Sequence, residues 1–298
     1  MTMPAHALPA VPLARRSPLS LLRELAALIK PRITASSTLA AAAGMATHGQ
    51  GWLSLSSGTS LAGIAACVAA ACTFNMWLER DSDGLMERTR GRPLPSGKLE
   101  APLAFFFACG LGTAGLLVLS VTAAPLALAL SLAALVLYAF AYTPLKRVTP
   151  AASVVGILPG AMPPVIGAAA LSQVTPLAWA LAVMLALWQL PHLMAVALRL
   201  RDQYAAAKLH TLLDWLGEAR AVKALQWGLL ALVPLAFLPL AVSREPLLVA
   251  GSLLAALIAL RSAVCAWFCN RAVFQSRRFI LDTVIYVIPP MLACLAFH

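Results

Sequence analysis

Charged side chains are scarce in this sequence, and acidic ones are the scarcest. Asp, Glu, Lys and Arg make up only 11% of the 298 residues, with 11 acidic against 22 basic, while 61% of residues are hydrophobic and the mean hydropathy is +0.85. Uncharged apolar runs of roughly 18 or more residues recur, each long enough to cross a bilayer as a helix. This excludes an ordinary soluble domain. It predicts an all-α polytopic membrane protein, because lipid offers no hydrogen-bond partners to open backbone groups.

Cysteine pairs and nucleophile constellations are also missing. None of the six cysteines belongs to a Cys-x-x-Cys pair, and all lie in apolar runs, at Cys67, Cys72, Cys109, Cys265, Cys269 and Cys294. Cys265 and Cys269 share a helix face, for which buried packing is expected rather than a disulfide or a metal site. No Ser/His/Asp or Cys/His constellation is present.

The apolar runs predict about nine transmembrane helices around a central cavity that opens at the cytoplasmic face. We expect them at about 31–48, 57–79, 100–121, 124–142, 151–171, 176–198, 222–242, 246–268 and 279–297. Lys and Arg gather before the first span and after every even-numbered span, which places the N-terminus in the cytoplasm. The net charge of +11 therefore indicates a membrane orientation and no nucleic-acid partner.

The N-terminal region divides in two. We expect a flexible cytoplasmic tail over 1–19 and a single transmembrane domain over 20–298, which begins with a short interfacial helix at Ser20–Ala27. Arg15 and Arg16 could belong to a twin-Arg or transit signal, but a cytoplasmic anchor before the first span is favoured, since no small-residue cleavage site precedes a long soluble domain.

One stretch, 75–98, is far more polar than the rest of the chain. Asn75, Glu79 and Asp83 are spaced at i, i+4 and i+8, so on a continuing helix they advance about 40° each time and stay on one face over about 12 Å. An amide oxygen and two carboxylates match the ligands of a hard cation such as Mg²⁺. The alternative is a solvated charged loop with internal ion pairs, such as Glu87 with Arg90.

Basic residues near this stretch could bind phosphate. Arg88, Arg90 and Arg92 follow the acidic residues, and arginine makes forked hydrogen bonds to phosphate oxygens. Lys30 and Arg32 flank a proline at the start of the first span and could also face an anion. Their alternative role is to anchor the helix end by snorkelling to the membrane surface.

The sixth span repeats the architecture of the second. Its apolar run also ends in a carboxylate among arginines, and both spans end at the same membrane face, so Asp202 could meet Asp83 across a shared cavity. His192 lies about 15 Å deeper along a helix. It is a candidate ligand or substrate contact, or else an interhelical hydrogen bonder.

The fifth span is rich in proline and glycine. Gly156, Pro159, Gly160, Pro163, Pro164 and Gly167 all lie within it. Proline leaves backbone groups unpaired and commonly kinks a membrane helix, so this span is expected to bend around a cavity. Close packing through small residues is the alternative.

Together these motifs resemble the UbiA superfamily of intramembrane prenyltransferases, most closely its heme O synthase (protoheme IX farnesyltransferase) branch. Asn-x-x-x-Glu-x-x-x-Asp followed by Met-Glu-Arg-Thr-Arg-x-Arg-Pro-Leu-x-x-Gly carries the resemblance. The runs that begin at Lys30, Tyr142, Gly160 and Trp188 match in the same order, so about residues 27–207 are covered. One departure is Gln203, where the branch usually has a carboxylate.

The resemblance implies a reaction and its site. Farnesyl is transferred from farnesyl diphosphate to a vinyl group of protoheme IX, giving heme O for terminal oxidases. It implies Mg²⁺ as the cofactor, held by Asn75, Glu79, Asp83 and Asp202. The diphosphate and acceptor are expected to contact Lys30, Arg32, Arg88, Arg92, Lys146, Arg147, His192 and Tyr204, with His192 at the heme.

Three alternatives to this reading stay open. The chain could prenylate another aromatic acceptor, such as a quinone precursor, it could be a transporter, or it could handle heme without catalysis. Heme-processing proteins or terminal oxidases, together with membrane lipid, are the expected partners. The Ala-rich chain and short leader favour a bacterial inner membrane over a mitochondrial one.

Overall fold

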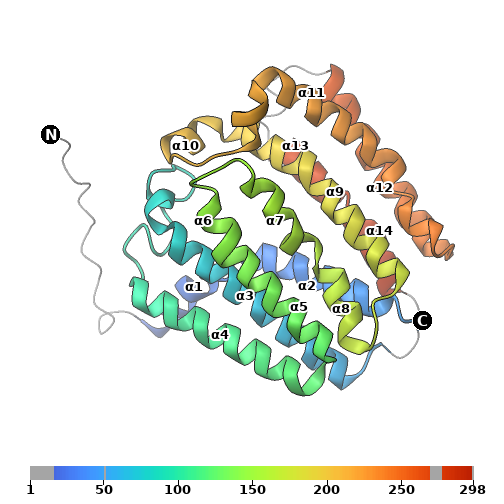
Figure 1. Cartoon of the computed structure of the whole chain (residues 1–298), viewed down its shortest axis with the longest axis horizontal. Coiled ribbons are helices and arrows are strands. Elements are labelled where there is room, and N and C mark those ends of the chain that lie inside the picture. Colours follow the sequence, from blue (N-terminus) through green and yellow to red (C-terminus); the bar gives the residue numbers. More distant parts are fainter. Residues whose placement is uncertain (1–16, 50–51, 269–276, 297–298) are drawn as a thin grey trace.

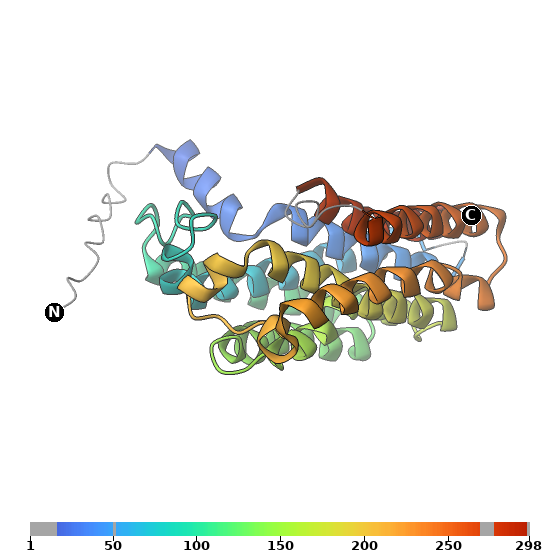
Figure 2. The same ribbon diagram turned by 90° about the horizontal axis from the view of Figure 1, so that it is seen from above.

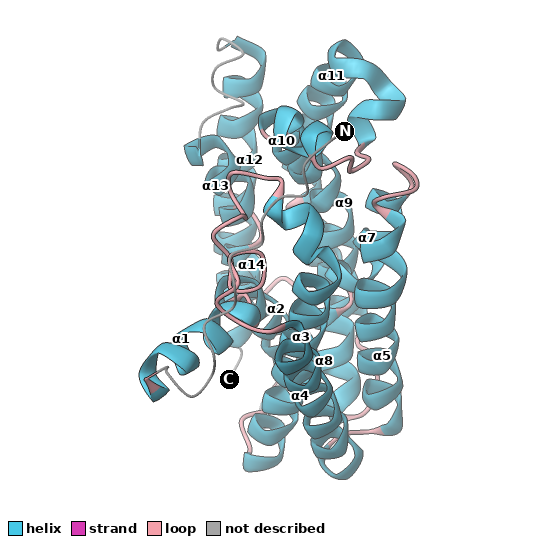
Figure 3. Ribbon diagram, turned by 90° about the vertical axis from the view of Figure 1, so that its left-hand side faces the viewer, coloured by secondary structure: helices cyan, strands magenta, loops and turns pink. Residues whose placement is uncertain are grey.

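The computed structural model describes residues 17–49, 52–268 and 277–296, and these residues form helices and no strand (Figures 1 and 3). The α-helices are α1 (Pro18–Leu28), α2 (Pro31–Ala46), α3 (Leu55–Gly84), α4 (Ala101–Thr122), α5 (Pro125–Val136), α6 (Thr143–Leu145), α7 (Ala152–Ala161), α8 (Pro163–Leu171), α9 (Pro176–Arg199), α10 (Arg201–Ala206), α11 (Leu212–Leu235), α12 (Pro246–Phe268), α13 (Arg277–Ile285) and α14 (Ile288–Leu295). A π-helix, η2 (Leu137–Tyr142), and a 3₁₀-helix, η3 (Leu238–Ala241), complete them.

The all-α membrane class is confirmed. Seven helical segments of the described chain are long and apolar enough to cross a membrane: 55–84, 101–122, 125–145, 152–171, 176–199, 212–241 and 246–268. The predicted spans at 31–48 and 279–297 correspond to the shorter helices α2 and α13 with α14. The chain is therefore a multi-pass membrane protein.

Local sequence explains most helix starts. Proline occupies the first turn of several helices, where its missing N–H costs nothing. α11 begins at Leu212, about ten residues before the predicted span, because Thr211 and Asp214 form a capping box there. Gly217, at φ 69° and ψ 160°, then kinks α11 before its apolar part.

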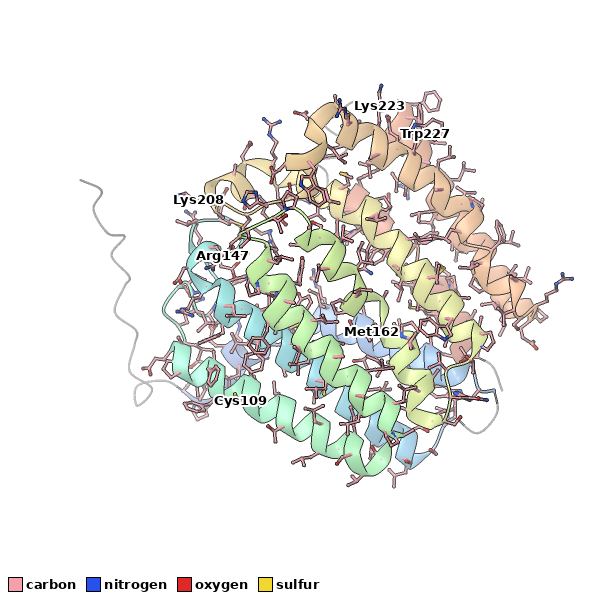
Figure 4. The ribbon with its side chains drawn as sticks, in the orientation of Figure 1. Cys109, Arg147, Met162, Lys208, Lys223 and Trp227 are labelled. Carbon is pink, nitrogen blue, oxygen red and sulfur yellow. The ribbon has the colours of Figure 1, made fainter. Side chains whose placement is uncertain are left out.

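The fifth span is bent, as its prolines predict. α7 and α8 meet at Met162, which lies at the break between the two helices (Figure 4). The alternative of close packing is also realised, because a Cβ added to Gly167 would lie 1.8 Å from the carbonyl oxygen of Ala41. α8 therefore contacts the backbone of α2 directly.

Helix α2 joins two hydrophobic cores. Ala41 and Met45 pack into a core formed with α3, α4, α5 and α8. Ala40 and Ala43 pack into a second core formed with α9, α11, α12 and α14. The small side chains of α2 allow both groups of helices to approach it. Figure 2 shows α1 projecting beyond this bundle at one end.

The N-terminal predictions are tested only in part. The expected helix at Ser20–Ala27 is present as α1. Residues 1–16 of the expected flexible tail, with Arg15 and Arg16, lie outside the described residues, as do Cys269 and Arg271. Cys67, Cys72, Cys109 and Cys294 are free thiols.

Candidate active site

The predicted stripe of oxygen atoms lies on an unbroken helix. α3 begins at the N-cap Ser54, whose hydroxyl accepts from the Ser57 N–H at 3.1 Å, and it runs through Asp83 to Gly84. The residues Asn75, Glu79 and Asp83 are 1%, 6% and 1% exposed, and all three line one cavity of about 220 Å³. Buried polar groups of this kind need partners inside the protein.

Each of these oxygen atoms has a basic partner from a different segment. The Lys30 ammonium donates to Asn75 Oδ1. Lys146 Nζ lies 2.6 Å from Glu79 Oε1, and Arg92 Nη1 lies 2.6 Å from Asp83 Oδ2. The buried carboxylates are thereby charge-paired, which offsets much of the cost of taking them out of water.

The segment after α3 is compact and is not a loose charged loop. Thr89 donates to the Asp83 carbonyl at 2.8 Å, and Ser96 donates to the Arg92 carbonyl at 2.6 Å. Leu94 and Leu99 are buried in a small core with Leu28. Glu87 and Arg90 form no ion pair with each other in the described part of the chain. The arginine side chains are therefore presented from a structured turn.

Two lysines of the site lie just outside the long membrane-spanning helices. Lys30 precedes α2 in the left-handed conformation, at φ 46°, and burial lowers its pKa to about 8. Lys146 follows α6. Burial opposes its charge, but Tyr142 and Glu79 outweigh this effect and raise its pKa. Both lysines carry their positive charge at neutral pH.

Aromatic residues from the π-helix form a second wall. The Tyr138 and Tyr142 rings lie 5.5 Å apart and both border the cavity. Lys146 Nζ lies 4.5 Å from the centroid of the Tyr142 ring, a cation–π contact. Gly156 of α7 makes room for this ring, because an added Cβ would lie 2.6 Å from it.

Tyr138 also borders a second, mainly apolar cavity of about 100 Å³. Ile33 is shared between the two cavities, and the second is lined further by side chains such as Ile64, Val68 and Ile166. The sequence did not predict either tyrosine as a site residue. The available signal was two tyrosines four residues apart, a spacing that places side chains on one face of a helix. The spacing alone does not tell which neighbours that face meets.

Helix α9 and the segment after it close the far side of the cavity. Leu193, Val196 and Ala197 form an apolar wall, and Tyr204 also lines the cavity. Burial raises the pKa of Tyr204. His210 N–H donates to the Lys146 carbonyl at 2.8 Å, which ties this segment to the end of α6. Lys208 and Arg147 lie at this same end of the molecule (Figure 4).

The structure does not bring Asp202 to the cavity. Its side chain is 99% exposed and faces Arg201, with Nε and Oδ1 3.8 Å apart. The neighbouring Gln203 does not line the cavity either, but its Oε1 accepts from the Arg88 N–H at 3.2 Å. This bond joins α10 to the turn after α3.

His192 contacts a neighbouring helix. Its Nδ1 lies 2.9 Å from the Thr283 hydroxyl of α13, and its ring stacks on Trp188 at 4.9 Å. It is not among the residues that line the two cavities described above. This arrangement favours the interhelical alternative over a substrate contact.

Two predicted basic residues also lie outside the cavity lining. Arg32 is exposed. Arg147 donates to the Leu78 carbonyl at 2.9 Å and so binds the outside of α3. The basic residues that line the cavity are Lys30, Arg88, Arg92 and Lys146.

Comparison with known proteins gives one consistent result. The model of the UbiA prenyltransferase family matches residues 35–281. The chain is 36% identical over 284 residues to the protoheme IX farnesyltransferase of Anaeromyxobacter sp. (strain Fw109-5), covering 92% of this chain and 93% of that protein. It is 38% identical over 223 residues to the protoheme IX farnesyltransferase of Myxococcus xanthus, covering 72% and 74%.

Solved structures show the same fold. A UbiA homologue from Aeropyrum pernix K1 in its apo form superposes with a TM-score of 0.71 at 18% identity, covering 88% of this chain and 96% of that one. A UbiA homologue from Archaeoglobus fulgidus bound to GPP and Mg²⁺ gives 0.67 at 16% identity, covering 91% and 99%.

Proposed function

The chain belongs to the UbiA prenyltransferase family, and we propose that it transfers the farnesyl group of farnesyl diphosphate to a vinyl group of protoheme IX. The products are heme O and diphosphate. Relatives named protoheme IX farnesyltransferase support the acceptor. The observation that carries the proposal for the site is a cavity with buried carboxylates and four cations that adjoins an apolar cavity at Tyr138.

The basic residues would bind the diphosphate. Lys30, Arg88, Arg92 and Lys146 approach the cavity from three different segments, so they can surround a polyanion. Charge that develops on the leaving diphosphate is stabilised by cations fixed in a site from which water is largely excluded. The other predicted cations, Arg32 and Arg147, would act at the rim or on α3.

The oxygen stripe fits Mg²⁺. Mg²⁺ is usually held by one or two carboxylates together with water and substrate phosphate. Asn75, Glu79 and Asp83 supply such a set of oxygen ligands. When bound, the ion adds positive charge at the leaving group. A role for Asp202 at a second ion would require α10 to turn.

The remaining residues handle the farnesyl chain and its reaction. The apolar cavity would receive the chain and, at about 100 Å³, would have to widen to hold all of it. Tyr138 borders both cavities, so its ring would lie beside the first carbon of the chain. Cleavage of the C1–O bond releases diphosphate, and the vinyl electrons form the new bond to C1. A water oxygen then adds to the resulting vinyl-derived cation and loses a proton, giving the hydroxyl of heme O. Excluding water from C1 itself protects the allylic cation.

The apolar wall of α9 is the proposed acceptor side. Leu193, Val196 and Ala197 line the same cavity as the stripe and would offer an apolar surface to a macrocycle. Sites for drug-sized ligands occupy about 300 to 1,000 Å³, more than this cavity offers. The segment between Lys208, at φ 53°, and Gly217 would therefore have to move for the acceptor to enter.

An assay tests this proposal directly. Purified protein in detergent is supplied with farnesyl diphosphate, protoheme IX and Mg²⁺, and the heme product is identified by its mass. Asp83→Ala should abolish the product, while Asp81→Ala, whose side chain is 75% exposed two residues away, should retain it. If product forms from a quinone precursor but not from protoheme IX, the proposed acceptor is wrong and the quinone precursor takes its place. The absence of any product from folded protein would reject catalysis.

A further inference from the structure

The oxygen atoms assigned to the metal are already occupied. Lys30, Arg92 and Lys146 bind Asn75, Asp83 and Glu79, one to one. We propose that metal and diphosphate bind this site together, as one complex. The three cations stay paired with the stripe residues until phosphate oxygens replace these partners. Free metal ion alone would then bind weakly. This inference rests on the proposed metal and diphosphate site.

The charges of the cavity support this coupling. The cavity lining contains four cations and two carboxylates, so it is already positive before any ligand enters. A free divalent cation would add to this excess in a partly buried site, where like charges repel strongly. A diphosphate carries more negative charge than one divalent ion neutralises. The complex of the two therefore matches the charge of the cavity, while the free ion does not.

The three cations would find new partners in the same cavity when they leave the stripe. Lys30, Arg92 and Lys146 line the same cavity as Arg88, so phosphate oxygens placed there would lie beside all four. Lysine side chains are flexible and keep three donors. Lys146 has an additional partner, the Tyr142 ring at 4.5 Å, which can keep its ammonium in place after it leaves Glu79.

Lys146 gives the sharpest test, because it pairs directly with one carboxylate of the stripe. Mn²⁺ serves as the probe, and its binding to the purified protein is followed by electron paramagnetic resonance with and without inorganic pyrophosphate. In the wild type, pyrophosphate should tighten Mn²⁺ binding by roughly tenfold to a hundredfold, within the usual range for coupled sites. In Lys146→Met, Mn²⁺ alone should bind more tightly and the enhancement by pyrophosphate should shrink by several-fold.

Two control variants define the effect. Lys223→Met removes an exposed lysine of α11 (labelled in Figure 4) that does not line the cavity, and it should keep the wild-type coupling. Lys146→Arg keeps the positive charge and should therefore keep most of the coupling between Mn²⁺ and pyrophosphate. Because coupling is reciprocal, Mn²⁺ should tighten pyrophosphate binding by the same factor as pyrophosphate tightens Mn²⁺.

The outcomes separate this inference from the function on which it rests. Mn²⁺ binding that needs Asp83 but is equally tight without pyrophosphate, and is unchanged in Lys146→Met, overturns the coupling and leaves the metal site intact. Mn²⁺ binding that is insensitive to Asp83→Asn under all conditions overturns the metal site itself. If Lys146→Met does not fold, Arg92→Met frees Asp83 in the same way and carries the same expectation.

Discussion

The side-chain oxygen of Gln203 accepts a hydrogen bond from the backbone N–H of Arg88, at 3.2 Å. This contact joins α10 to the turn after α3, beside the cavity that Arg88 and Tyr204 line. Related sequences of the heme O synthase branch were expected to have a carboxylate near this point. Here the amide makes the contact without placing a negative charge beside the cavity.

We therefore expect that Gln203 is compatible with activity and that its hydrogen bond contributes to it. Gln203→Ala removes one hydrogen bond, worth about 1 kcal/mol, and should lower kcat/KM by several-fold. Gln203→Glu can still accept the bond, but its charge would compete with diphosphate for Arg88 and should raise the KM for farnesyl diphosphate. Gln173→Ala, an exposed glutamine between α8 and α9, is the control. Equal KM values for the Glu variant and the wild type would contradict this role.

Tyr138 should protect the reacting carbon from water. Tyr138→Phe keeps the ring at the junction of the two cavities and should retain activity within about threefold. Tyr138→Leu loses the aromatic face, whose contact with a desolvated cation is worth about 2 kcal/mol, or roughly thirtyfold in rate. The Leu variant should also release farnesol. Phe140 is an exposed residue of the same π-helix, and Phe140→Leu should not release farnesol. Heme O and farnesol are measured together by chromatography. An unchanged ratio of farnesol to heme O in Tyr138→Leu would contradict this role of Tyr138.

His192 should matter for stability more than for heme binding. It bonds to Thr283 and stacks on Trp188, so His192→Ala should lower the free energy of unfolding by about 1 kcal/mol or more. Thr283→Val should have a similar effect, because it removes the same hydrogen bond. Thermal unfolding and a heme titration in the Soret region test this. Loss of heme binding in folded His192→Ala alone would restore the ligand role implied by the family resemblance.

The contact between α2 and α8 should not tolerate an added methyl group. A Cβ at Gly167 would lie 1.8 Å from the Ala41 carbonyl oxygen, and backbone cannot yield as a side chain can. Gly167→Ala should therefore destabilise the protein by about 1 to 3 kcal/mol or more. Gly110→Ala in α4 meets nothing within 4 Å and should be neutral or stabilising by up to about 1 kcal/mol. Similar unfolding temperatures for the two variants would show that the helices can separate at little cost.

Sequence reasoning succeeded where the signal is local. Apolar runs predicted the membrane class, and prolines predicted the bend that the structure places at Met162. The spacing of Asn75, Glu79 and Asp83 predicted one face of a helix, because helical periodicity fixes relative direction over a few turns. The same reasoning assumed that Asp202 faced inward, but α10 begins a new helix after Leu200, so the register of α9 does not continue through it.

The sequence by itself determined the class of the protein, its helices, its family and the stripe of oxygen atoms on α3. Only the tertiary structure decided which cation meets which oxygen, since Lys30 and Lys146 are far from Asn75 and Glu79 along the chain. It also decided that Tyr138 joins two cavities and that His192 faces α13. Periodicity and hydropathy act between near neighbours, whereas these contacts depend on how helices that are distant along the chain pack together.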